Sequence, residues 1–179
     1  MRQRRAALDK NALDTAATAL CARLIELDVY HEANRIAAYF AVNGEISLHP
    51  LIEHALAQGK EVFLPNLDQQ ALRFAPYYDG QKMRTNKFRL PEPDVTDAEM
   101  IAPEALDIVL APLTVFDAER NRIGMGGGFY DRSFAFRKNP EIRKPVLIGV
   151  AHDLQRVDLI IPETWDVRLD KIVTDQTTY

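Results

Sequence analysis

The sequence is poor in cysteine, in glycine outside one short segment, and in long apolar runs. Its one cysteine, Cys21, cannot form an internal disulfide, which fits a reducing compartment. The first residues, Met-Arg-Gln-Arg-Arg, lack the apolar core of a signal peptide. No apolar run is long enough to cross a bilayer. These absences exclude a disulfide-stabilised secreted domain and a helical membrane protein, so we expect a cytoplasmic protein without a membrane partner.

The chain also lacks an excess of basic residues. Lys and Arg number 22 against 26 Asp and Glu, which gives a formal net charge of −4. A mildly acidic chain is a poor candidate for broad nucleic-acid binding, which requires a basic surface. The 179 residues suit one domain, and neither a repeat nor a low-complexity linker divides them. We therefore expect residues 1–179 to form a single domain, a monomer that acts on small molecules and has no nucleic-acid partner.

Strand-like and helix-like patterns alternate along the chain, and each is read from its apolar spacing. The predicted strands are Arg35–Val42, Glu61–Leu64 (ended by Pro65), Ala71–Tyr78, Asp107–Leu113, Pro145–Ala151 and Lys171–Thr174. The predicted helices are Arg4–Leu27, Leu48–Gln58 (with Ser47 as N-cap and Gly59 as stop) and Phe129–Arg137, with a long loop over Asp79–Asp97. This order favours an α/β fold of three layers, in which a mostly parallel sheet carries helices on both faces.

Four of the eight glycines lie within Gly124–Gly128, between a predicted strand and a predicted helix. Glycine tolerates positive φ and lets a ligand approach the backbone, whose successive N–H groups can then bind an anion. The segment is not a Walker A motif, and it is not a dinucleotide fingerprint, because Phe129 occupies the third glycine position. On spacing alone, a phosphate site and a plain tight turn both stay open.

The residues after the glycines also allow two readings each. Asp131 can join a phosphate through Mg²⁺, which prefers carboxylate and phosphate oxygens, or it can be a first-turn acid favoured by the helix dipole. Arg132 can pair with a phosphate or with Asp131. Tyr130 can stack on a flat heterocycle or pack as a half-buried core residue.

Three other places carry candidate polar residues. Glu45 follows Gly44 at the C-terminal end of a predicted strand, where it can bind a ligand or act as a cap. Asp166 and Asp170 would share one helix face and can complete a metal site or stay solvated. The basic run Lys82–Arg89 can contact an anionic substrate or form a solvated surface.

Several blocks of this sequence resemble one known family. The segment PLTVFDAERNRIGMGGGFYDR is similar to the signature of 5-formyltetrahydrofolate cyclo-ligase, also called 5,10-methenyltetrahydrofolate synthetase. YFAVNGEI, Glu92-Pro93 and WDVRLDKIVT also match, and the resemblance runs from about Arg2 to Thr174. It implies a three-layer fold related to the sugar-phosphate isomerase and CoA-transferase group. It also implies conversion of 5-formyltetrahydrofolate and ATP to 5,10-methenyltetrahydrofolate, ADP and phosphate, with Mg²⁺.

The resemblance also implies roles for particular residues. The family's ATP loop matches Arg122, Ile123, Gly124, Met125, Gly126, Gly127, Gly128, Phe129 and Tyr130. The substrate contacts match Phe40, Glu45, Met125, Gly126, Gly127, Gly128 and Phe129, and the metal ligands match Asp131 and Asp170. Arg132 and Asp166 are further possible members of the site. The family's Lys-x-x-x-Arg pair that reaches ATP falls upstream of Met1. Two alternatives stay open: Arg2, Arg4 or Arg5 substitutes for it, or the triphosphate is held differently.

The implied chemistry needs no enzyme nucleophile. The formyl oxygen attacks the γ-phosphate, N10 closes the ring and phosphate departs, so the protein positions the reactants and stabilises charge. The sequence agrees, since it has no Gly-x-Ser-x-Gly elbow. Two alternatives stay open: a sugar-phosphate isomerase on a similar scaffold, and a non-catalytic folate or nucleotide binder.

Overall fold

A six-stranded sheet forms the centre of the computed structural model, which describes residues 1–179 except for the side chain of Arg2. The strands, in spatial order, are β10 (Lys171–Thr174), β9 (Val146–Ala151), β6 (Ile108–Pro112), β1 (Arg35–Ala37), β2 (Glu61–Asp68) and β3 (Ala71–Tyr77). All neighbours are parallel except β2 and β3. The predicted mostly parallel sheet is therefore confirmed, with one antiparallel edge.

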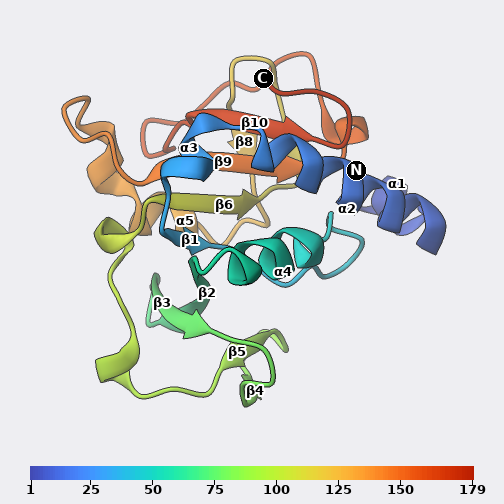
Figure 1. Ribbon diagram of the computed structural model, residues 1–179. Helices are drawn as coiled ribbons and strands as arrows, with labels where there is room; N and C mark the ends of the chain where they lie inside the picture. Colours follow the sequence, from blue (N-terminus) through green and yellow to red (C-terminus); the bar gives the residue numbers. More distant parts are fainter.

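Apolar side chains leave the sheet alternately on its two faces, as the period of a strand requires. On β1, Ile36 belongs to one buried cluster and Ala37 to the other. The first cluster is covered by α2 (Lys10–Ile25), α3 (Asp28–Glu32) and α4 (His49–Ala57), which lie in front of the sheet in Figure 1. The second is covered by α5 (Phe129–Ser133), by Phe134 and by segments near the C-terminus.

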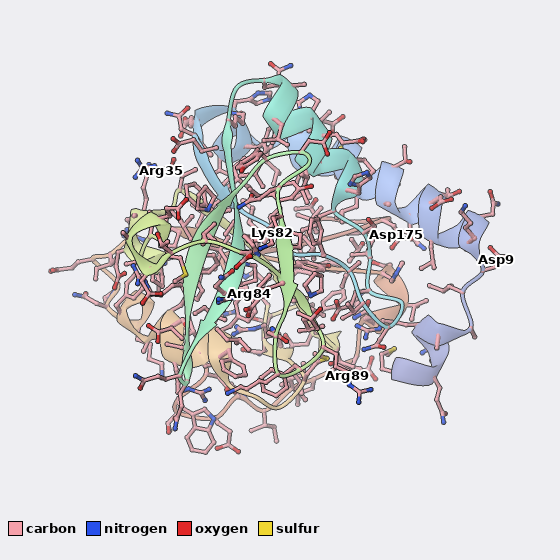
Figure 2. The ribbon with its side chains drawn as sticks, turned by 90° about the horizontal axis from the view of Figure 1, so that it is seen from below. Asp9, Arg35, Lys82, Arg84, Arg89 and Asp175 are labelled. Atoms are coloured by element: carbon pink, nitrogen blue, oxygen red, sulfur yellow. The ribbon has the colours of Figure 1, made fainter. Side chains whose placement is uncertain are left out.

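The long N-terminal helix that the sequence predicts is two helices. α1 covers Arg2–Ala6 and α2 starts at Lys10. Asp9 separates them as the N-cap of α2, and its carboxylate accepts the backbone N–H of Ala12 at 2.8 Å. Figure 2 shows Asp9 at this bend. Apolar spacing continued across the bend, so the prediction of one helix was wrong because it gave no weight to the capping residue.

The strand predicted over Arg35–Val42 is shorter than expected. Pairing with both neighbours stops at Ala37, and the chain then turns, with Asn43 and Gly44 at φ 52° and 73°. The next helix, α4, starts at His49, one residue later than predicted. Ser47 still accepts the N–H of His49, at 3.2 Å. This turn between β1 and α4 carries Glu45.

Pro65 does not end β2, which continues to Asp68. Ala38 N–H donates to Phe63 O, so the backbone N and O atoms of Phe63 point toward β1. Because these directions alternate along a strand, the backbone N of Pro65 points toward the same side. β1 has already ended there, so the missing N–H of Pro65 breaks no bond to it. The prediction was wrong because a proline is tolerated wherever its position in the ladder has no partner.

Two short hairpins complete the fold. β4 (Met83–Thr85) pairs with β5 (Pro91–Pro93) inside the region predicted as a loop, and β7 (Val115–Phe116) pairs with β8 (Arg122–Ile123) just before the glycines. 3₁₀ turns occur at Asp97–Glu99, Pro103–Ala105, Ala135–Lys138 and Asp153–Gln155. The helix predicted over Phe129–Arg137 is α5 followed by one of these turns. Within residues 1–179, no helix combines the length and the apolar character that a bilayer crossing needs.

Candidate active site

A cavity of about 500 Å³ lies where β1 and β6 end. Its walls come from the turn after β1, the glycine segment after β8 and the β4–β5 hairpin. Leu64, Pro65 and Leu67 of β2 also contribute. Open α/β sheets place ligands at this edge, outside the carboxyl ends of their parallel strands. The volume is in the range of small-molecule sites, so the cavity is the candidate active site.

The glycine segment forms one wall as a loop between β8 and α5. Gly126 and Gly128 have φ of 92° and 63°, a region that other residues rarely adopt. A Cβ added at Gly124 or Gly126 would meet no atom within 4 Å, so the backbone there is open to a ligand. The loop base is tied down by Thr114, whose hydroxyl donates to Gly124 O at 3.2 Å. The following helix has only five residues, so its dipole adds less than the sequence suggested.

Arg132 braces the glycine loop from outside the cavity. Its guanidinium donates to the carbonyl oxygens of Gly127 and Gln70, each at 2.7 Å, and lies 5.1 Å from the centre of the Phe129 ring. Arg132 therefore does not pair with Asp131, which was one of the two possibilities that the sequence left open. Its bonds hold two segments that are far apart in the sequence.

Asp131 lines the cavity from the first turn of α5. Its Oδ1 accepts Arg122 Nη2 at 2.8 Å and the backbone N–H of Val167 at 3.1 Å. The Arg122 side chain is buried and also donates to Val167 O. The predicted ATP contact Arg122 thus supports the predicted metal ligand Asp131 from behind, and Oδ2 of Asp131 has no partner among the described groups.

Glu45 stands on the wall formed by the turn after β1. It is 8% exposed, and its Oε2 accepts the N–H of Val42 at 3.1 Å. Burial raises the pKa of Glu45, while the Val42 N–H and the Arg5 guanidinium act in the opposite direction. A buried carboxylate with one oxygen engaged can accept a hydrogen bond from a ligand, and doing so would offset part of its desolvation.

Aromatic side chains make the rest of the cavity largely apolar. Phe40 lines it and packs edge-to-face on Tyr77, with ring centres 5.3 Å apart. Tyr130 also lines it, and burial together with the charge of Glu45 raises the pKa of the Tyr130 hydroxyl. Tyr130 is therefore a buried wall residue whose ring stacks on Phe134. Met125 belongs to the lining as well, although it is half exposed.

The N-terminal arginines lie behind this cavity or outside it. Arg4 is exposed on α1, whereas Arg5 is 1% exposed and donates through Nη1 to Leu113 O at 3.1 Å. Nε and Nη2 of Arg5 are buried without a partner among the described groups. Neither Arg4 nor Arg5 lines the cavity, and the side chain of Arg2 lies outside the described part.

The second predicted metal ligand, Asp170, does not line the cavity that Asp131 lines. Both carboxylate oxygens of Asp170 accept Arg137 Nη2 at 2.8 Å, and Oδ2 also accepts the N–H of Leu147 at 2.7 Å. Asp166 accepts the N–H of Glu163 at 2.9 Å and lines a smaller hollow next to Arg122. Neither Asp166 nor Asp170 is among the residues that line the main cavity.

The β4–β5 hairpin is the part of the site that sequence reasoning missed. Asn86, Phe88 and Glu92 line the cavity opposite the glycine loop, and the Phe88 ring meets Phe129 edge-to-face with centres 5.8 Å apart. Glu92 is 3% exposed and accepts the N–H of Leu67 and the amide of Asn86, each at 2.9 Å. Two signals in the sequence pointed to this region, the match at Glu92-Pro93 and the basic run Lys82–Arg89, but neither predicted a hairpin or the roles of Asn86 and Phe88.

The basic residues of the hairpin are partly neutralised. Lys82 pairs with Asp94 at 2.6 Å and Arg84 approaches Glu92 at 3.6 Å. Lys82 and Arg84 lie close together in Figure 2, whereas Arg89 points away from them at the far end of the hairpin. The run therefore does not act as a single positive patch.

Comparison with known proteins gives a consistent result. A family model described as the 5-formyltetrahydrofolate cyclo-ligase family matches residues 1–175. The 5-formyltetrahydrofolate cyclo-ligase of Escherichia coli (strain K12) is 32% identical over 177 residues, which are 97% of this chain and 96% of the relative. That of Haemophilus influenzae is 35% identical over 170 residues, with 93% and 88% covered.

Two solved structures resemble the fold closely. The 5,10-methenyltetrahydrofolate synthetase of Aquifex aeolicus superimposes with a TM-score of 0.82 at 25% identity, covering 99% of this chain and 87% of its own. The synthetase of Mycoplasma pneumoniae gives a TM-score of 0.76 at 21% identity, covering 98% and 94%. The whole chain thus has counterparts in both sequence and structure.

Proposed function

Because this chain belongs to the 5-formyltetrahydrofolate cyclo-ligase family, we propose that it converts 5-formyltetrahydrofolate and ATP to 5,10-methenyltetrahydrofolate, ADP and phosphate. One observation carries the proposal to the level of the site. Gly127 and Gly128 of the glycine loop and the buried carboxylate of Glu45 face a single cavity of about 500 Å³. A phosphate-binding backbone and an acceptor for a polar heterocycle are the two groups that this pair of substrates requires.

The pterin end of the substrate is assigned to the Glu45 side. The aromatic and aliphatic walls there, Phe40 and Leu64 among them, suit a flat ring. The amino and ring N–H groups of a reduced pterin are donors, and the Glu45 carboxylate accepts. The glycine core from Met125 to Phe129 would touch both the folate and the nucleotide, because it lies between the two.

The phosphates are assigned to the glycine loop. A Cβ at Gly124 or Gly126 would meet no atom within 4 Å, which leaves room for phosphate oxygens beside the backbone there. Ile123 and Met125 are each 52% exposed beside this loop and offer apolar surface to the base of the nucleotide. Arg4 is exposed and would reach the triphosphate, whereas Arg5 would need to leave its buried position.

The donor set fits a Mg²⁺ ion that arrives with the nucleotide. Among the described side chains, no group of three His, Cys, Asp or Glu residues is arranged to hold a metal. Asp131 alone lines the cavity beside the glycine loop, and Mg²⁺ is commonly held by one or two carboxylates together with phosphates. When bound, the ion would supply neutralisation of the phosphoryl charge. Asp170 would have to give up its bonds to Arg137 to take part.

The chemistry proposed for the site activates a poor electrophile. The formamide oxygen attacks the γ-phosphorus and ADP leaves, so the formyl oxygen becomes part of a good leaving group. N10 then attacks the formyl carbon, its N–H proton is lost, and phosphate departs to leave the methenyl bridge. The protein holds N10 against the formyl carbon, stabilises the phosphoryl charge through loop N–H groups, and excludes water with the apolar walls.

The same proposal extends to the setting of the reaction. Residues 1–179 would act as one catalytic domain in the cytoplasm, as a monomer. The partners would be small molecules alone.

An absorbance assay tests the function directly. The methenyl bridge extends the conjugation of the pterin, so product absorbs where 5-formyltetrahydrofolate does not. We expect product only when ATP and Mg²⁺ are both present, with one ADP released per methenyl group. Isomerisation of a sugar phosphate without ATP, or a ligand-induced thermal shift without ADP release, would refute the proposal.

A further inference from the structure

His152 is a buried histidine to which the proposed reaction gives no role. It follows β9 directly, is 2% exposed, and its Nε2 lies 3.2 Å from the carbonyl oxygen of Gly44. The turn after β9 is closed by the backbone of His152, whose N–H donates to the side-chain oxygen of Gln155 at 3.0 Å and whose carbonyl accepts the N–H of Gln155 at 2.9 Å. The ring therefore joins two segments that are 108 residues apart in the sequence.

The contact with Gly44 fixes which ring nitrogen carries a proton. A carbonyl oxygen can only accept, so Nε2 must carry the proton that it shares with Gly44. Burial lowers the pKa of His152 and the Arg5 charge does so too, against Asp175 and the Gly44 carbonyl. Burial thus favours the neutral ring with its proton on Nε2.

The Gly44 carbonyl belongs to the turn that presents Glu45. The peptide group is planar, so the direction of the Gly44 oxygen also fixes the Glu45 N–H and the path of the chain at Glu45. Gly44 cannot be exchanged for a larger residue, because a Cβ there would lie 2.9 Å from the Arg5 carbonyl oxygen. The turn is closed by Glu45 N–H to Val42 O at 3.0 Å, and His152 ties this closed turn to the end of β9.

The same end of β9 also holds the glycine-loop side of the cavity. Gln155 Nε2 donates to Leu113 O at 2.8 Å and to Thr114 O at 3.1 Å, and Thr114 in turn holds Gly124. His152 holds the Glu45 turn and Gln155 holds the base of the glycine loop, so both walls are fixed from the same turn after β9.

We propose that His152 is a positioning residue for substrate binding, which fixes the peptide plane between Gly44 and Glu45 and so aims the Glu45 carboxylate into the cavity. This inference rests on the proposed function, because it gives Glu45 the pterin as its ligand. It predicts that loss of the His152 contact weakens the binding of folate but not that of ATP, since the glycine loop keeps its own support through Gln155.

Two substitutions at one position separate this role from simple packing. His152→Asn keeps the backbone bonds to Gln155, and Asn is a good N-cap, but its amide is too short to reach Gly44. His152→Gln places an amide donor near the position of Nε2. We expect His152→Asn to raise KM for 5-formyltetrahydrofolate about tenfold, with kcat and the KM for ATP little changed, and His152→Gln to restore most of the loss. His49→Asn, on the exposed face of α4, is the matched control and should change nothing.

The outcomes are distinct for each idea. No methenyl product from the unchanged protein would refute the proposed function itself. Product formation together with an unaltered folate KM in His152→Asn would overturn the positioning role alone. If the Asn variant does not fold, nitrogen NMR of the imidazole in the unchanged protein still decides, because a proton on Nδ1 and none on Nε2 contradicts the inference.

Discussion

At the scale of residues, the role proposed for Glu45 predicts that substrate binding depends on pH. Burial raises the pKa of Glu45 above the ordinary value of 4.5, and the ionised carboxylate accepts from N–H groups more strongly than the protonated acid. Folate affinity should therefore fall as the pH drops through this raised pKa. Glu45→Gln should weaken folate binding by about tenfold or more and remove this pH dependence, with the KM for ATP unchanged. Equilibrium titration with 5-formyltetrahydrofolate at several pH values measures both effects, and an unaltered affinity would contradict the assignment.

The raised pKa of Glu45 has the opposite effect on the stability of the fold, which decreases where ionised Glu45 would favour binding. A carboxyl whose folded pKa is raised contributes stability that is complete below its unfolded pKa and is lost as the pH rises through the folded one. Glu45 thus lowers the free energy of unfolding in the pH range where it binds substrate best. Such opposition is typical of a residue kept for function rather than stability.

Asp131 is the second residue whose substitution separates binding from turnover. Asp131→Asn retains the shape and one acceptor for Arg122 and Val167 but removes the charge that Mg²⁺ needs. We expect turnover to fall about 100-fold, with a higher Mg²⁺ requirement and a much smaller change in folate affinity. Initial rates across a Mg²⁺ series measure this. Asp170→Asn is the comparison: its bonds to Arg137 predict a lower melting temperature, and an equal rise in Mg²⁺ requirement would instead support a metal role.

At the scale of elements, the β4–β5 hairpin closes the cavity through one aromatic contact. Phe88, 52% exposed at the turn of the hairpin, reaches Phe129 at the end of the glycine loop. Phe88→Ala should raise KM for both substrates about three- to tenfold, because it removes part of the wall and the edge-to-face contact. The free energy of unfolding should change by about 0.5 kcal/mol or less, since the side chain is half exposed. Tyr78→Ala, exposed nearby and outside the cavity lining, is the control, and equal KM values in the two variants would contradict the role of the hairpin.

The elements also show how far sequence reasoning reaches. The core strands were predictable because runs such as Ile108–Pro112 are apolar on both faces of a buried parallel sheet. The hairpin was not, because its pairing depends on Glu92 reaching the distant Leu67, and the local sequence shows only charge and proline. Asp131, Glu45 and part of the predicted glycine loop do line one cavity, with Met125 and Gly127–Tyr130 in its wall. Arg122, Ile123, Gly124 and Gly126 are not among the lining residues. Asp170 was placed with them by family resemblance, and its contact with Arg137 could not be read from spacing.

At the scale of the whole molecule, the sheet joins both halves of the chain. Strands from the first half, β1 and β2, lie next to β6 and β9 from the second, and the two apolar clusters share that sheet. We therefore predict a single cooperative thermal transition for residues 1–179, with equal calorimetric and van't Hoff enthalpies. Folate at about 100 times its Kd should stabilise the folded state by about 2.7 kcal/mol. Differential scanning calorimetry with and without ligand measures both, and two separate transitions would show that the chain is not one folding unit.

The contact between Gly44 and the Arg5 carbonyl has a practical consequence for anyone who expresses this gene. A short terminal segment such as Met1–Ala6 invites truncation. Here, however, the Arg5 carbonyl of this segment lies against Gly44, in the turn that forms one wall of the pocket. A version that begins a few codons later would still encode all six strands of the sheet. We expect this shorter protein to fold and to be produced in normal amounts, but to bind folate weakly.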